Sequence, residues 1–473
     1  MRMEHDYLGE MELDDRAYYG IQTSRGMHMS DVTGHSVGQD GAPLIRALAE
    51  IKKAAARANL AVGGLDSIQA SAIERAADEV LDGTWKDQFP VDLITGGGGV
   101  SIHMNMNEVL ARRASELSGG VRLHPNTHVN MGQSTNDVLP SAMLIATCRL
   151  LHTLAGIVTD LAEAVEKKQA EFAHVVKLGR TCLQDALPIT LGQEFSGWSS
   201  FLRRQAALLE EHAEECLALP LGGTAVGTGV GSLPGYSEAV FVHLRQISGL
   251  NVVPADNRFD SMQNADVYIR LSATLKALAA GLSKMASDLR LMSSGPRAGL
   301  GEIELPAVLP GSSIMPGKIN PILPELMIQV YFLVYGNDAA ITLAAERGEL
   351  DLNVWESVVS KCVFESCRLL SHSISLFNHF CIVGIRANEA HCRRQAEEST
   401  ATASVVASVF GYETGSKIAR SAVASGQTIK ETVVREGLME QADADALLDP
   451  EYMTDSAQMA ERIMRARTHL RRH

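Results

Sequence analysis

A short stretch at residues 311–321 brings together the side chains best suited to chemistry. It contains two adjacent hydroxyls, Ser312 and Ser313, followed by the ammonium of Lys318 and the amide of Asn320. Its glycines and central proline argue against helix and strand, so the stretch is predicted to be a loop. Asn320 and the proline after it suit the start of a helix that continues into the next apolar run. A hydroxyl, a cation and a helix N-terminus in one place favour proton transfer on an acidic substrate.

The string GSSIMPGKINP in this loop resembles the signature of the aspartase/fumarase superfamily, whose members eliminate a group from a substituted succinate and release fumarate. The resemblance implies that Ser312 is the general base and that Lys318 is the cation beside it. Because a serine hydroxyl is far too basic to ionise unaided, we expect the amides of Ile314 and Met315 to stabilise its oxygen. From the residues alone, Ser312 is an ordinary turn serine. Glu325 is included among the candidate substrate-binding residues, as a partner of Lys318 or a proton relay; the alternative is a first-turn glutamate favoured by the helix dipole.

A second polar block, Ser134, Thr135 and Asn136, also resembles a family motif. The resemblance implies that these side chains, together with Ser313, surround a substrate carboxylate and the leaving group. A helix N-terminus behind them would add positive potential. The alternative is structural, because Asn136 or the aspartate after it suits the cap of a helix that runs on from Pro140.

A third block, beginning Gly-Arg-Thr, resembles the family but departs from it. By resemblance, Thr181 joins Lys318 and Asn320 in holding the second carboxylate, and the next residue contacts the substrate. That residue is Cys182, where histidine or glutamine is usual; no base is evident beside it, so a small buried thiol is favoured over a nucleophile. Val100 stands where a substrate-contacting threonine is usual. These two departures leave the identity of the leaving group open.

Other polar positions give weaker signals. His103 stands where the family usually has asparagine, and His124 and Asn126 resemble a secondary anion site. Thr127 replaces the aspartate usual in that site, which weakens the carry-over. The presence of a real second anion site is therefore left open.

Two glycine-rich stretches do not indicate a nucleotide. The glycines at 96–99 suit either a close backbone approach to a ligand or a plain turn, and no Lys-Ser or Lys-Thr follows them. The stretch at 222–229 lacks the third glycine of a dinucleotide fingerprint because Ser232 occupies its place, and no strand precedes it. It resembles a turn of the superfamily instead.

Composition narrows the class of protein. The chain has 473 residues, 46% of them hydrophobic, and a formal net charge of −14, which argues against binding to nucleic acid or to an anionic membrane. No secretory signal is recognised, and the longest apolar stretch is too polar to span a membrane. Seven scattered cysteines without Cys-x-x-Cys spacing indicate reduced thiols in the cytoplasm, and no metal site is predicted. No cofactor is predicted.

Helical periodicity dominates the chain and predicts an all-α fold. Apolar residues at 271, 275, 278, 282, 285, 289 and 292 form a heptad stripe suited to a bundle core, and Thr190 with Gln193 forms a capping box. No convincing alternating strands are found. By resemblance we expect three domains: a mainly helical N-terminal domain at 1–140, a central long-helix bundle at 141–394 that carries the loop 311–321, and a small helical domain at 395–473.

The function that the resemblance implies is that of a carbon–nitrogen lyase that converts L-aspartate, or a close amino-substituted succinate, to fumarate. The mechanism implied by the resemblance is removal of a proton by the serine through an aci-carboxylate intermediate. The alternatives are a class II fumarate hydratase and a catalytically silent scaffold. The resemblance also implies a homotetramer that completes the bundle and shares its active sites between subunits. A small dicarboxylate is the expected ligand, without nucleic acid or membrane partners.

Overall fold

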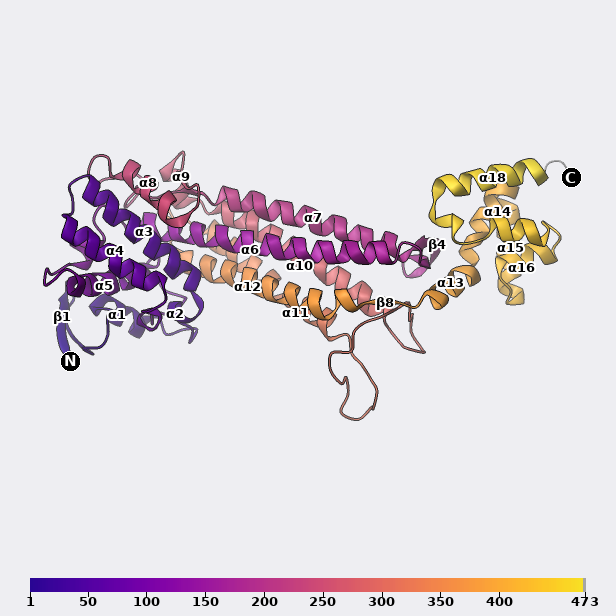
Figure 1. Cartoon of the computed structure of the whole chain (residues 1–473), viewed down its shortest axis with the longest axis horizontal. Coiled ribbons are helices and arrows are strands. Elements are labelled where there is room, and N and C mark those ends of the chain that lie inside the picture. Colours follow the sequence, from indigo (N-terminus) through magenta and orange to yellow (C-terminus); the bar gives the residue numbers. More distant parts are fainter. Residues whose placement is uncertain (471–473) are drawn as a thin grey trace. The chain divides into compact units, whose positions relative to one another are not determined.

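The computed structural model describes residues 1–470 and is built mainly from α-helices (Figure 1). The predicted all-α class is confirmed. The described residues divide into two compact units, each made of three segments. Unit 1 comprises Met1–Gly156, Gln205–Ala279 and Val330–Ser371, and unit 2 comprises Ile157–Arg204, Ala280–Gln329 and His372–His473.

The boundaries between these segments fall inside five long helices. They are α6 (Thr135–Glu171), α7 (Leu191–Glu215), α10 (Asp266–Met292), α11 (Ile322–Glu346) and α12 (Glu356–Phe380).

Unit 1 contains the N-terminal helices and the short elements after α7. Its elements are β1 (Arg2–Asp6), β2 (Gly9–Leu13), α1 (Ile21–Met29), α2 (Val37–Asp40), α3 (Ala42–Ala61), α4 (Ser67–Leu81), η1 (Lys86–Gln88), α5 (Val100–Leu117), the single π-helical turn η2 (Pro125–Val129), β5 (Ala218–Leu219), α8 (Tyr236–Ser248), β6 (Val253–Pro254) and α9 (Arg258–Gln263). Helix α3 packs against α4 and α8, and α4 packs against α5 (Figure 1). Fully buried apolar side chains such as Leu48, Ile73 and Met106 fill the space between these helices.

Unit 2 contains a β-hairpin and the C-terminal helices. Its elements are β3 (Val176–Thr181), β4 (Gln184–Thr190), β7 (Ile303–Glu304), η3 (Ile382–Gly384), β8 (Arg386–Ala387), α13 (Glu389–Glu398), η4 (Thr400–Thr402), α14 (Ala403–Phe410), α15 (Tyr412–Ser425), α16 (Ile429–Arg435), α17 (Gln441–Leu447), η5 (Tyr452–Thr454) and α18 (Ser456–Leu470).

The strands correct the expectation that no strands would be found. They form two-stranded sheets, antiparallel for β1–β2, β3–β4 and β7–β8 and parallel for β5–β6. The hairpin β3–β4 lacks an Asn-Gly or Asp-Gly turn signal, because its turn residues are Cys182 and Leu183. These two residues nevertheless adopt positive φ values, of 54° and 58°. A register shift between Leu178 and Arg180 also interrupts the regular alternation of its first strand.

The long helices bury the apolar stripe that the sequence predicts. On α10, Leu271, Leu275, Leu278 and Leu282 are all at most 1% exposed, and the stripe continues to Met292. The predicted capping box also forms at the start of α7, because the Thr190 hydroxyl accepts from the Gln193 amide at 3.0 Å and the Gln193 side chain accepts from the Thr190 amide at 2.9 Å. Both predictions are confirmed.

Two of these helices, α6 and α11, have the length and composition of membrane spans. In α6, 61% of the most apolar window is buried within the chain, as in the core helix of a soluble protein, whereas in α11 only 33% is buried. Helix α11 therefore leaves a large apolar surface uncovered by its own chain.

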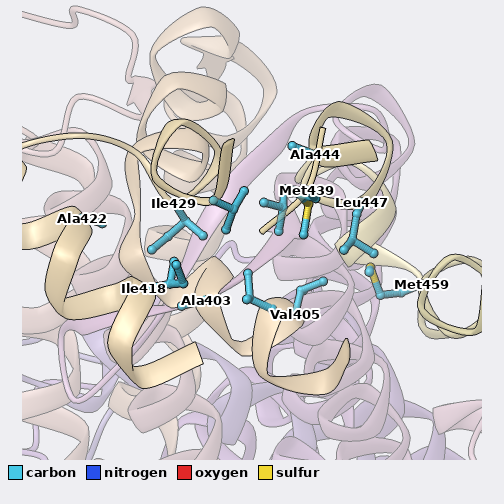
Figure 2. Close-up of a cluster of buried hydrophobic side chains, with 12 residues drawn as sticks. Ala403, Val405, Ile418, Ala422, Ile429, Met439, Ala444, Leu447 and Met459 are labelled. Carbon is cyan, nitrogen blue, oxygen red and sulfur yellow. The ribbon is translucent and has the colours of Figure 1, made fainter. Parts of the chain in front are cut away.

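The C-terminal tail, the helices from Ala403 onward, has a hydrophobic cluster of its own. Figure 2 shows its buried side chains gathered between the helices of the tail. The members are Ala403, Val405, Val406, Ile418, Ala422, Ile429, Val433, Met439, Ala444, Leu447, Leu448 and Met459.

We expect Ile418→Ala to destabilise this tail. Ile418 is 2% exposed, and truncation of a buried isoleucine to alanine typically costs about 2–5 kcal/mol because it leaves a cavity. On the same helix α15, Val423 is 70% exposed, so Val423→Ala is the matched control and should change the free energy of unfolding by less than about 0.5 kcal/mol. Denaturant unfolding followed by circular dichroism measures both, and equal losses in the two variants would contradict the assignment of this core.

Candidate active site

The loop at residues 311–321, called here the signature loop, holds the Ser312 hydroxyl with two backbone amides. The Ser312 Oγ accepts from the amide of Ile314 at 3.2 Å and from the amide of Met315 at 3.0 Å. These are the two donors predicted from the sequence, and the prediction is confirmed. Donors aimed at one oxygen stabilise negative charge on it and so lower the cost of removing its proton.

Hydrogen bonds close the base of the signature loop. The Gly311 amide donates to the Lys318 carbonyl at 2.8 Å, and the Asn320 side-chain amide donates to the Gly311 carbonyl at 2.8 Å. A Cβ at Gly311 would lie 2.8 Å from the backbone nitrogen of Asn320, so only glycine allows this closure. Helix α11 begins at Ile322, directly after the predicted Asn-Pro start. The loop is therefore fixed at its ends while its middle extends outward.

The remaining polar groups of the loop are open to solvent. Ser313 and Lys318 are exposed, and among residues 1–470 the Lys318 ammonium makes no hydrogen bond or ion pair. Glu325 lies in the first turn of α11 and is 3.6 Å from Arg290. Of the alternatives stated for Glu325, the structure thus favours the first-turn glutamate over a pair with Lys318. The dipole of α11 favours a glutamate in its first turn, and Arg290 supplies the partner charge.

The hairpin β3–β4 carries Thr181 and Cys182 at its tip. Both are exposed, which corrects the expectation of a buried thiol at 182. Below the tip, Arg180 lies 2.6 Å and Lys177 lies 3.1 Å from the Glu302 carboxylate, which is fully buried. Burial alone would lower the pKa of Lys177, but the nearby carboxylates raise it above its ordinary value. This ionic cluster anchors the hairpin in unit 2 and leaves its tip free.

Ser134, Thr135 and Asn136 lie at the N-terminus of α6 in unit 1, and all three are partly exposed. The Ser134 hydroxyl accepts from the Asn136 amide at 3.3 Å, while the Asn136 side chain donates to the Ala225 carbonyl at 2.8 Å. Helix α6 begins at Thr135, with Pro140 inside it. The predicted cap at Asn136 or the following aspartate is therefore wrong by two or three residues, because the cap is Ser134.

Asp137 joins this block to the glycine-rich turn 222–229. Its buried carboxylate accepts from the backbone amides of Ser134 at 2.9 Å, Gly222 at 2.9 Å and Thr224 at 3.1 Å. Burial raises the pKa of Asp137 to about 6, and these amides oppose the rise. The turn predicted at 222–229 is thus confirmed, and its function in the fold is to hold the start of α6.

The raised pKa of Asp137 predicts a pH dependence of stability. Because the folded-state pKa lies above the ordinary value of 3.8, the folded protein holds this proton more tightly, and the associated stability is lost as pH rises through about 6. The shift corresponds to about 3 kcal/mol. The free energy of unfolding of the wild type, measured relative to Asp137→Asn, should fall by about this amount between pH 4 and pH 7. A difference that stays constant across this range would contradict the assignment.

The glycine-rich stretch 96–99 leads into α5, which begins at Val100. Gly99 has a φ of 71°, and a Cβ there would lie 2.1 Å from a methyl carbon of Leu139. Glycine at 99 thus lets this loop approach the first turns of α6 closely. Val100 is 42% exposed.

At the candidate anion site around His124, the imidazole is hydrogen-bonded to backbone amides of its own turn. The His124 Nδ1 accepts from the amides of Asn126 and Thr127, both at 3.2 Å. Burial, followed by the nearby charges of His128 and Arg122, lowers the pKa of His124 and disfavours the cation that an anion would require. The structure gives no support to an anion site built on this imidazole.

The structure thus groups the predicted residues by unit. Ser312, Ser313, Lys318 and Asn320 share the signature loop of unit 2, and the hairpin of the same unit carries Thr181 and Cys182. Ser134, Thr135 and Asn136 belong to unit 1. Sequence reasoning missed Asp137 as a buried carboxylate and missed Lys52 entirely. A lysine in an otherwise alanine-rich helix face was the only available signal for Lys52.

Comparison with known proteins assigns the class. A family model described as "Lyase" matches residues 9–336, and one described as "Fumarase C C-terminus" matches residues 403–455. The chain belongs to this lyase family, the aspartase/fumarase superfamily. The resemblance stated from the signature loop is confirmed.

Individual relatives cover almost the whole chain. An aspartate ammonia-lyase from Bacillus subtilis is 44% identical over 96% of both chains. A protein named fumarate hydratase class II 2, from Bradyrhizobium diazoefficiens, is 41% identical over 96% of both chains. Among solved structures, a fumarate lyase:delta crystallin from Brucella melitensis matches with a TM-score of 0.93 and 44% identity, over 96% of this chain and 99% of that chain.

Proposed function

We propose that this chain is a carbon–nitrogen lyase that converts L-aspartate to fumarate and ammonia. The observation that carries the proposal is the Ser312 hydroxyl held by two loop amides, 3.0 and 3.2 Å away, on the loop that also carries Lys318. Similarity to several aspartate ammonia-lyases at 42–44% identity over 96% of the chain supports the choice of reaction.

In the proposed mechanism, ionised Ser312 removes a proton from C3 of the substrate. The electron pair of the broken C–H bond moves into the adjacent carboxylate, which becomes a dianionic aci-carboxylate. Collapse of this intermediate forms the C2–C3 double bond and breaks the C–N bond, and the nitrogen leaves with its bonding electrons. Stabilising the dianion is the dominant problem, and one well-placed donor is typically worth about 3 kcal/mol.

The remaining candidates divide between the two carboxylates. We assign Ser134, Thr135, Asn136 and Ser313 to the carboxylate that bears the developing charge. Lys318, Asn320 and Thr181 would hold the other carboxylate and fix the reacting geometry. Glu325 is left out of the substrate-contacting set, because it pairs with Arg290.

A second reaction, hydration of fumarate, is the alternative; Gly301 and Gly317 resemble the hydratases, whereas Cys182 does not. Val100 and Cys182 leave the identity of the leaving group open, because an exposed apolar side chain and a thiol stand where polar contacts to that group are usual, and a hydrogen bond lost there costs about 1–3 kcal/mol if its partner is buried. The 41% identity to a protein named fumarate hydratase is in keeping with this alternative. The two reactions thus differ in the leaving group, which is an ammonium in the lyase and a hydroxyl in the hydratase.

One assay separates the candidates. Purified protein is incubated with fumarate in the presence of ammonium, or in buffer alone, while fumarate absorbance is followed and the product is identified by mass spectrometry. Ammonium-dependent loss with formation of aspartate supports the lyase. Loss without ammonium and formation of malate would overturn it in favour of the hydratase. Absence of any loss would overturn both and leave either a silent scaffold or an enzyme for a different substrate.

We further propose that the enzyme is a cytoplasmic homotetramer whose active sites draw residues from several subunits. Support comes from the large apolar side chains exposed on α11, namely Phe332, Leu333, Tyr335 and Leu343. Such a surface on a long helix suits burial against other helices of the same assembly. Light scattering should give the mass of four chains.

The three-domain division at 1–140, 141–394 and 395–473 also stays a proposal, supported for the tail by its separate buried cluster.

A further inference from the structure

A chain of buried polar side chains lies behind Thr135. Lys52 on α3 and His103 on α5 are both completely buried. The Lys52 Nζ is 2.7 Å from the His103 Nε2, and the His103 Nδ1 is 2.8 Å from the Thr135 Oγ1. Polar groups are thus linked from a buried amine, through one imidazole, to a hydroxyl at the partly exposed start of α6.

The other partners of Lys52 are acceptors whose orientation is fixed. The Lys52 Nζ donates to the Asn130 Oδ1 and to the Gln133 Oε1, both at 2.9 Å. The Asn130 side-chain nitrogen donates to the Gln133 carbonyl, and the Gln133 side-chain nitrogen donates to the Val129 and Met131 carbonyls. Because these nitrogens are committed to backbone carbonyls, both side-chain oxygens must face Lys52. Two of its protons are therefore assigned.

The hydrogen bond between Lys52 and His103 determines the tautomer of the His103 imidazole. In its ammonium form Lys52 has three protons and no lone pair, so its third proton goes to the His103 Nε2. Burial lowers the pKa of Lys52 well below its ordinary value, and the nearby Asp137 carboxylate opposes this fall. Burial also lowers the pKa of His103 well below its ordinary value, so the imidazole is neutral and carries its single proton on Nδ1.

We propose that His103 is a positioning residue that makes Thr135 an obligatory hydrogen-bond donor to the substrate. With its proton on Nδ1, His103 donates to the Thr135 Oγ1, and the Thr135 hydroxyl proton is left free to point away from the protein interior. That proton fits a carboxylate oxygen and does not fit an ammonium group. The assignment rests on the proposed function for the identity of the ligand, and it places Thr135 on a carboxylate rather than on the leaving amine.

Two variants of His103 separate its two hydrogen bonds. In His103→Asn the amide nitrogen occupies the place of Nδ1, so the donor to Thr135 is kept and the contact with Lys52 is lost. In His103→Gln the amide reaches the place of Nε2, so the contact with Lys52 is kept and the donor to Thr135 is lost. We expect His103→Gln to lower kcat/KM about tenfold, mainly through KM, and His103→Asn to lower it less than about threefold.

A double-mutant comparison tests whether His103 acts through the hydroxyl. In a Thr135→Val background the effect of His103→Gln should disappear, because no hydroxyl remains to be oriented. Equal losses in His103→Asn and His103→Gln, or losses that multiply in the Thr135→Val background, would overturn the proposal, since a merely structural histidine predicts both. Thermal unfolding of each variant controls for loss of folded protein.

The tautomer itself can be tested without any substrate. Neutron diffraction from unliganded wild-type crystals grown in heavy water should show deuterium on the His103 Nδ1, none on Nε2, and three on the Lys52 Nζ. Deuterium on Nε2 would overturn the proposal even if the enzyme is an aspartate lyase. Conversely, wild-type protein without turnover would reject the proposed function, while deuterium on Nδ1 would still support the assignment of Thr135 as a donor.

Discussion

Replacing Ser312 with alanine is expected to lower kcat by about 10³- to 10⁴-fold, the upper part of the range for loss of a general base. The effect should fall on kcat far more than on KM, because the hydroxyl is used in proton removal and three carboxylate-binding groups, Ser313, Lys318 and Asn320, remain in the same loop. The backbone amides that hold the Ser312 Oγ, at 3.0 and 3.2 Å, would then have no charged oxygen to stabilise. Steady-state kinetics of fumarate release measure this directly.

The control for Ser312→Ala is Ser404→Ala. Ser404 is exposed on α14, where its hydroxyl donates to the Ala401 carbonyl at 2.8 Å, so its loss should leave kcat within about twofold. Both variants should elute from size-exclusion chromatography like the wild type. A Ser312→Ala enzyme with more than a tenth of the wild-type kcat would remove Ser312 from its proposed role.

Replacing Lys318 with methionine is expected to lower kcat/KM about 10²- to 10³-fold. The ammonium is exposed and without an ion pair among residues 1–470, so its charge is available to a dianionic substrate. Loss of one partner of a hydrogen-bonded charge pair costs about 2–5 kcal/mol, and the larger part should appear in KM. Methionine keeps the length of the side chain while it removes the charge.

Two comparisons make the Lys318 result specific. Lys318→Arg keeps the charge and should recover part of the lost kcat/KM, although the different shape of the guanidinium limits the recovery. Lys417→Met removes a charge that is also exposed and lies 3.8 Å from the Glu436 carboxylate in the C-terminal helices, and it should change kcat/KM by less than about twofold. Similar losses for Lys318→Met and Lys417→Met would show that only overall charge matters.

The parts of this fold that depend on local sequence could be predicted from the sequence. The capping box at Thr190 and the buried stripe on α10 follow from residue spacing, because the geometry of one helix determines them. The same holds for Ser312, whose two amide donors lie two and three residues further along the chain. In each case the partners are near neighbours in sequence.

What the sequence could not predict involves partners far apart in the chain. Glu325 pairs with Arg290 instead of Lys318, and Asp137 accepts from amides some 85 residues away. The exposure of Cys182 depends on a hairpin turn with positive φ at two non-glycine residues, for which the sequence carries no standard signal. The chain from Lys52 to Thr135 likewise requires α3, α5 and α6 to be placed together before it can be recognised.

The most direct test of the central claim follows the hydrogen at C3. Wild-type protein is supplied with fumarate and ammonium in heavy water, and the aspartate formed is examined by mass spectrometry and NMR. We expect aspartate with one deuterium at a single position on C3, and formation of this product by Ser312→Ala at least about 10³-fold more slowly. Failure of the wild type to form deuterated aspartate, or its formation by Ser312→Ala at the wild-type rate, would contradict the account.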